Sequence, residues 1–133
     1  MRYEARSSAP PEVVWELMAC PDRWHEWAPH VRGGEGLGSP RVVAGSSGTV
    51  SVLGAPVPAS ITAVIPGRMW AWKLGAVRIQ HLVVASGEGS IIRFDLRGPF
   101  AAELAMRVSY GPLTALLARN LGRVAAGERI SEN

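Results

Sequence analysis

Glycine and proline interrupt the middle of this chain at short intervals, and this spacing limits the folds open to it. Between Val31 and Gly98, turn signals such as Pro66-Gly67 and Gly87-Glu88-Gly89 recur about every 8 to 12 residues. The runs between them are rich in β-branched and aromatic residues: 49–53, 57–65, 69–74, 77–85 and 90–96. Short runs with frequent turns are typical of an antiparallel meander, which excludes a sheet built from alternating strands and helices.

Two of these runs alternate apolar and polar side chains, which indicates a sheet with one buried and one solvated face. Trp70 and Trp72 share one side of their run, and Ile92 and Phe94 oppose Arg93 in another. Residues two apart on a strand lie on the same face, so one face is available for packing. The run 57–65 does not settle which of its faces, Ser60/Thr62/Val64 or Ala59/Ile61/Ala63, is turned inward.

Helical patterns flank the predicted sheet. Residues 2–8 suit an edge strand, and a helix follows with Ser8 as a candidate cap and prolines in its first turn. Pro21 ends this helix, and residues 22–27 predict a second short one. A long last helix is predicted from an apolar stripe at helical spacing, broken from residues 100–110 by Gly111-Pro112. The stripe consists of Leu113, Leu116, Leu117, Leu121 and Val124.

The length of 133 residues, without repeat or linker, predicts a single domain over 1–133. No apolar run approaches the roughly 18 residues of a membrane span, and the first residues lack the apolar segment of a secretory signal. We therefore expect a cytoplasmic protein that does not insert into membranes. Cys20 is the only cysteine, and the 14 basic residues are scattered, so neither a disulfide nor a nucleic-acid partner is expected.

Three segments, in this order, resemble the START/SRPBCC superfamily, which includes polyketide cyclase/dehydratase and lipid-transport proteins. Residues 9–17, APPEVVWEL, resemble the opening A-P-x-E-x-V-W of that family. Residues 21–29, PDRWHEWAP, resemble D-P-x-x-W-P-x-W-x-P, and residues 65–73, IPGRMWAWK, resemble the hairpin P-P-R-x-L-A-W-R. The resemblance implies the α+β helix-grip fold: a curved antiparallel sheet of about seven strands, two short helices and a long C-terminal helix, with a cavity between the sheet and that helix.

The same resemblance supplies candidate ligand-binding residues for the cavity. They are Trp24, Trp27, Thr62, Val64, Trp70, Trp72, His81, Phe94, Leu117 and Asn120. Tryptophans suit an apolar pocket with a few polar handles. Trp24 and Asn120 match pocket residues of the aromatase/cyclase branch, whereas Thr62 and Val64 stand where that branch has serine and arginine. Asn120 and His81 also have a purely structural interpretation, as buried polar groups that are satisfied within the core.

The segment from His25 to His30 resembles the zinc-binding motif H-E-x-x-H but is one residue longer. The extra residue turns the two rings to different sides, and Pro29 interrupts the helix between them. We interpret both as surface histidines and expect no metal and no cofactor.

The leading functional hypothesis is binding, extending to carriage, of a small hydrophobic or aromatic molecule in the cavity. The alternative is an enzyme of polyketide cyclase/dehydratase type, in which His81 moves a proton and Asn120 holds a carbonyl or enolate oxygen. A third hypothesis is a protein- or nucleic-acid-binding module that uses Arg78, Arg93 and Arg97 on the outer face. Homodimer formation is left open.

Overall fold

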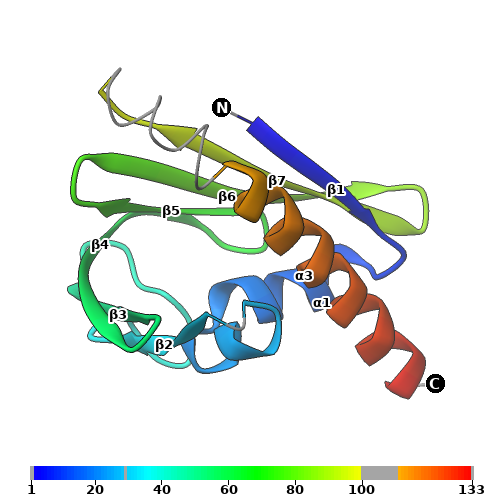
Figure 1. Cartoon of the computed structure of the whole chain (residues 1–133). Helices are drawn as coiled ribbons and strands as arrows, with labels where there is room; N and C mark the ends of the chain where they lie inside the picture. Colours follow the sequence, from blue (N-terminus) through cyan, green and yellow to red (C-terminus); the bar gives the residue numbers. More distant parts are fainter. Residues whose placement is uncertain (1, 29, 100–110, 133) are drawn as a thin grey trace.

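In the described part of the chain, residues 2–28, 30–99 and 111–132, seven antiparallel strands form one curved sheet (Figure 1). This computed structural model gives the backbone alone for residues 111–113 and 128–132. The strands are β1 (Arg2–Ser7), β2 (Val31–Glu35), β3 (Ser47–Val52), β4 (Ala55–Ile65), β5 (Met69–Leu74), β6 (Val77–Ser86) and β7 (Gly89–Arg97). The helices are α1 (Pro11–Ala19), the 3-10 helix η1 (Pro21–Glu26) and α3 (Gly111–Glu132).

The sheet order is β1-β7-β6-β5-β4-β3-β2, so the strands from β2 to β7 form the predicted meander. β1 pairs with β7, which makes β1 and β2 the two edges. The chain must therefore pass from one edge to the other after β1, and α1 and η1 carry it across. α3 then packs against β1, β7 and α1 (Figure 1). The α+β helix-grip architecture predicted from the sequence is confirmed.

Strand β4 settles which face of the run 57–65 points inward. Ala59 and Ile61 are buried, while Thr62 is exposed. The register between β4 and β5 shifts between Ile61 and Ala63, which places Thr62 at an irregularity of the ladder. Such a bulge bends its strand and increases the local twist. Thr62, a candidate ligand-binding residue implied by the resemblance, is therefore on the exposed side of β4.

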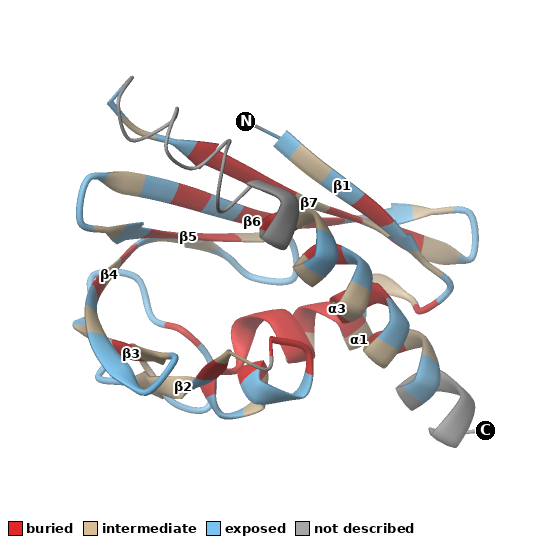
Figure 2. Ribbon diagram, in the orientation of Figure 1, coloured by how far each residue is buried: buried red, intermediate tan, exposed pale blue. Residues whose placement is uncertain are grey.

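The face of α3 that packs on the sheet coincides in part with the predicted apolar stripe. Leu121 is buried and Leu117 and Val124 pack against the core, but Leu116 is 58% exposed. Thr114, Ala118 and Ala125, outside the stripe, are buried, so buried and exposed positions alternate along the helix (Figure 2). A Cβ at Gly122 would lie 3.0 Å from the carbonyl oxygen of Arg6. Small residues thus bring the helix close to β1. The side chain of Leu113 and the piece predicted over 100–110 lie outside the described residues.

Both ends of α1 show features that the sequence pattern did not predict. Its N-cap is Pro10, without a side-chain cap, and not Ser8. At its C-terminal end, the carbonyl oxygen of Ala19 accepts a hydrogen bond from the amide of Val42 at 2.9 Å. Within the described residues, no helix is long and apolar enough to cross a membrane.

Gly89, where β7 begins, tests the close packing of β1 against β7. A Cβ at this position would lie 2.1 Å from the carbonyl oxygen of Ser7, so Gly89→Ala must displace backbone. We expect this substitution to lower the free energy of unfolding by about 1–3 kcal/mol, measured by urea denaturation. Gly127→Ala is the control, because a Cβ there meets nothing within 4 Å and alanine favours the helix. An unchanged free energy of unfolding in Gly89→Ala would show that β1 and β7 pack less closely than described.

Candidate functional site

Three tryptophan side chains are anchored to the C-terminal end of α1. Trp24 and Trp70 both donate their indole N–H to the carbonyl oxygen of Met18, at 2.9 and 3.0 Å. Trp27 donates in the same way to the carbonyl oxygen of Leu17, at 2.9 Å. The last carbonyls of a helix have no partner within it, so these indoles satisfy acceptors that burial would otherwise leave unpaired. The bonds also fix the position of each ring.

The anchored rings build an aromatic cluster. Trp70 stacks on His81 with ring centroids 3.8 Å apart and on Trp24 at 5.5 Å, with interplanar angles of 13° and 11°. Trp72 stands edge-on to all three rings, at centroid distances of 5.2, 5.0 and 5.6 Å from Trp24, Trp70 and His81. Stacked and edge-on pairs each contribute roughly 0.5–1.5 kcal/mol beyond area burial. The cluster is therefore a rigid wall.

Cross-strand register places two rows of side chains on this wall. Trp70, His81 and Phe94 lie opposite one another on β5, β6 and β7. Trp72 and its partner Ile79 begin the next row, which Leu96 completes. Antiparallel pairs on one face bring side chains together in this way.

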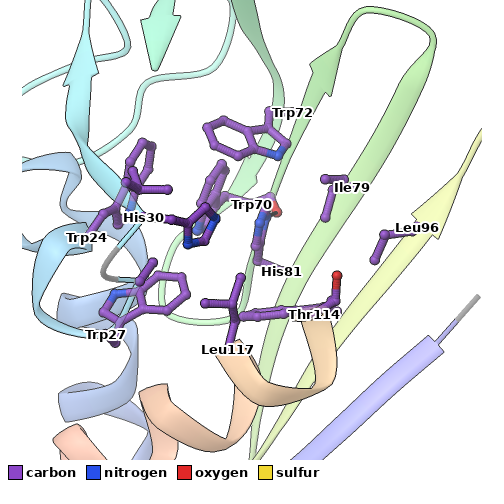
Figure 3. Close-up of a pocket in the computed structure, with 13 residues that line it drawn as sticks. Trp24, Trp27, His30, Trp70, Trp72, Ile79, His81, Leu96, Thr114 and Leu117 are labelled. Atoms are coloured by element: carbon purple, nitrogen blue, oxygen red, sulfur yellow. Dashed lines mark hydrogen bonds between the residues drawn. The ribbon is translucent and has the colours of Figure 1, made fainter. Parts of the chain in front are cut away.

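These rows, together with η1 and α3, enclose a cavity of about 60 Å³ (Figure 3). Seven predicted site residues lie on its wall: Trp24, Trp27, Trp70, Trp72, His81, Phe94 and Leu117. The other lining residues are Ala28, His30, Val31, Ile79, Leu96 and Thr114. A water molecule takes about 30 Å³ of liquid, and pockets for drug-sized ligands measure about 300–1,000 Å³. The cavity is therefore narrow.

His81 is a neutral group at the centre of the wall. It is 5% exposed, and burial lowers its pKa to about 3 despite the hydrogen bond with the carbonyl of Trp70. Its Nδ1 lies 3.2 Å from that carbonyl oxygen, which can only accept, so Nδ1 carries the proton. Nε2 is then an unprotonated acceptor.

His30 differs from the expectation of a surface histidine. It is half-buried, its Nε2 is buried without a hydrogen-bond partner among the described residues, and burial lowers its pKa. Figure 3 shows its ring projecting into the space between Trp27 and Trp70. Trp72 Nε1 likewise has no partner within the described part of the chain. An unsatisfied buried donor costs about 1–3 kcal/mol.

Three predicted site residues lie elsewhere. Asn120 donates its side-chain N–H to the carbonyl oxygen of Trp27 at 2.7 Å, which ties α3 to the end of η1. Val64 is half-buried at the margin of the core, and Thr62 is exposed. The structure does not place any of these three on the cavity wall.

Some of the wall residues that the sequence analysis missed had a visible signal. Ile79 shares its face with His81, and Leu96 shares its face with Phe94, by simple alternation. His30 had no such signal, because it lies in the turn between η1 and β2, where side-chain direction follows no period.

The outer surface offers a wider but different hollow. A polar depression of about 470 Å³ lies over β2 and β3 and includes Asp22, Arg32 and Glu35 in its lining. The predicted basic patch on the outer face is partly neutralised, since Arg93 pairs with Glu4 at 2.8 Å and Arg97 with Asp95 at 3.2 Å. Neither feature brings together rings and unpaired buried groups as the cavity does.

Comparison with known proteins supports the same architecture. A family model described as "Polyketide cyclase / dehydrase and lipid transport" matches residues 1–126. The solution structure of BH1534 from Bacillus halodurans is 16% identical, with a TM-score of 0.71 over 93% of this chain and 94% of that one. Ara h 8.0201 is 15% identical, with a TM-score of 0.65 over 93% and 95%. The Aha1 dimer from Colwellia psychrerythraea is 17% identical, with a TM-score of 0.64 over 92% and 96%. The search of curated proteins finds no significant match.

The neutral state of His81 predicts acid sensitivity. The folded protein holds its pKa near 3, while the unfolded chain protonates the ring near the ordinary value of 6.5. Unfolding therefore takes up a proton between these values, so this contribution to stability is complete above 6.5 and is lost as pH falls toward 3. The loss reaches up to about 1.4 kcal/mol per pH unit.

His81→Phe removes this contribution while keeping a ring in the stack. We expect urea denaturation from about pH 7 to pH 4 to give a shallower decline in unfolding free energy for the variant than for the wild type. His25→Phe, at an exposed position of η1, is the control and should keep the wild-type slope. If the unfolding free energy fell equally steeply with pH in His81→Phe and in the wild type, a buried, neutral His81 would be contradicted.

Proposed function

Because this chain belongs to the polyketide cyclase/dehydrase and lipid transport family, we propose that it binds a small, largely apolar molecule in the cavity beneath α3. The observation that carries the proposal is the aromatic wall, with anchored indoles around a space that the described side chains leave unfilled. Burial of a ligand there is favoured by about 25 cal/mol for each Å² of apolar surface removed from water. A planar ring would also stack on or pack edge-on to the wall.

Entry runs between His30 and Leu117. These are the half-buried members of the described cavity lining, whereas the other lining residues are buried. Figure 3 shows the two side chains on the same side of the space, in front of the ring stack. Movement of these two side chains would enlarge a cavity of about 60 Å³ enough for a single-ring molecule, without disturbing the anchored tryptophans. The ligand is therefore small.

Catalysis has less support than binding. A histidine whose pKa is near 3 is a neutral imidazole at neutral pH, so it is a poor general acid and a weak base. Asn120, the second group required by a cyclase or dehydratase mechanism, is engaged with the carbonyl of Trp27. The proposal is accordingly a binding or carrier protein, acting in the cytoplasm and without a nucleic-acid partner.

α-Methylstyrene, an apolar single-ring molecule, tests the proposal. We expect it to bind the wild-type protein in calorimetry and to raise Tm, since a ligand at 100 times its Kd adds about 2.7 kcal/mol to stability. Leu117→Phe should reduce binding at least about tenfold by filling the cavity mouth, a change of 1.4 kcal/mol. Leu116→Phe is the matched control, because Leu116 is exposed and does not line the cavity.

Two results would oppose this proposal. The absence of any binding by the wild-type protein would remove the ligand-binding function itself. Equal binding by Leu117→Phe and Leu116→Phe would place the binding site outside the cavity. Size-exclusion chromatography of the same samples would show whether two copies associate.

A further inference from the structure

The four indoles on the cavity wall are not equivalent. Trp24, Trp27 and Trp70 donate their N–H groups to carbonyls at the end of α1. Trp72 Nε1 has no partner among the described residues, although the residue is only 8% exposed. In Figure 3 the ring nitrogen of Trp72 lies on the edge of the indole that faces His81 and Ile79, toward the cavity. A buried donor therefore points at the space that a ligand would occupy.

Such a donor requires an acceptor, because an indole N–H can only donate. The protein supplies none within the described residues, and a buried unpaired donor is rare in folded proteins. The Nε2 atoms of His30 and His81 also line this space, so a water molecule there would be the group that a ligand oxygen replaces. A ligand oxygen would satisfy the donor.

The charge of the wall restricts that oxygen further. The described lining residues include no lysine, arginine, aspartate or glutamate. His81 is held neutral by burial, so it brings no cation to the wall. A carboxylate in this space would lose its hydration without gaining a cation, which is a strongly unfavourable exchange. A neutral carbonyl, ether or hydroxyl oxygen meets no such penalty.

We propose that the ligand is an uncharged molecule with an acceptor oxygen, and that Trp72 Nε1–H donates to this oxygen while the cavity excludes carboxylates. This inference rests on the proposed function and narrows its ligand class. It separates ketones, aldehydes and alcohols from fatty acids and other organic anions, which the apolar wall alone does not do.

Three probes of the same non-hydrogen atom count test the inference. They are acetophenone, which carries a carbonyl oxygen, α-methylstyrene, which has a methylene group in its place, and benzoate, which carries a charge. We expect benzoate to bind at least about tenfold more weakly than acetophenone at neutral pH. Equal affinity of the two would overturn the exclusion of anions.

Trp72→Phe measures the hydrogen bond itself. The ratio of the affinities for acetophenone and α-methylstyrene should fall about tenfold in this variant relative to the wild type, and the comparison cancels the different solubilities of the probes. Trp15→Phe is the matched control, because Trp15 is a buried tryptophan that does not line the cavity, and its ratio should stay at the wild-type value. Trp72→Phe removes an unsatisfied donor, so we expect it to fold.

A measurement on the wild type alone keeps the test independent of any variant. In protein with 15N-labelled tryptophan, the indole proton of Trp72 should move downfield with acetophenone and not with α-methylstyrene, while the protons bonded to α1 stay in place. Binding of both probes with an unchanged ratio in Trp72→Phe, or without this selective shift, would overturn the inference and leave the proposed function intact. Failure of both probes to bind would overturn the proposed function.

Discussion

The C-terminal end of α1 is the point on which the candidate site depends. Helix ends leave carbonyls unpaired, and here the oxygens of Leu17 and Met18 accept three indole N–H groups from η1 and β5. Two of these bonds come from the segment that directly follows α1 and one comes from β5, so a short helix positions both the rings before β2 and a ring of β5. If these bonds were lost, buried donors and acceptors would be left unpaired together, which is more costly than the loss of a single contact. The geometry of the wall is thus a consequence of how one helix ends.

The same packing that stabilises the wall also narrows the cavity. The stack of His81, Trp70 and Trp24 occupies volume that a ligand would otherwise fill. On the opposite side, Gly122 and neighbouring small residues let α3 approach β1 closely. A sheet and a helix that pack this closely leave a cavity of about 60 Å³. Close packing therefore stabilises the fold but reduces the volume available to a ligand. Ligand size is therefore set by the half-buried rim, where side chains can move, and not by the anchored rings.

The sequence predicted those features that follow from hydrophobic periodicity or from the spacing of turn-forming residues. Turn spacing gave the meander, and alternation on β5 and β7 placed Trp72 and Phe94 on one wall. Where tertiary packing decides, the pattern was right only in part. Leu121 of the predicted stripe is buried, but Leu116 is exposed and Ala118 and Ala125 are buried, on a helix that approaches β1 closely at Gly122. Helical periodicity identifies an apolar face but does not report how closely a partner approaches.

Polar groups were harder to assign, because their role depends on the partner and not on the residue type. Asn120 and Trp72 illustrate the difference. For Asn120 the sequence left open a ligand handle or a satisfied structural group, and its amide donates to a carbonyl of the protein. Trp72 was predicted to line the cavity, but nothing in the sequence indicated that its N–H would find no partner in the described chain. Both outcomes are fixed by backbone positions that the fold brings together from distant segments, and no spacing in the sequence reports them. A folded chain tolerates one unpaired donor at modest cost when the remaining indoles are satisfied. An unpaired donor at the edge of a cavity is positioned to bind an acceptor on a ligand. Among four similar side chains, hydrogen-bond partners therefore distinguish the three indoles bound to α1 from the one whose N–H remains available to the proposed ligand.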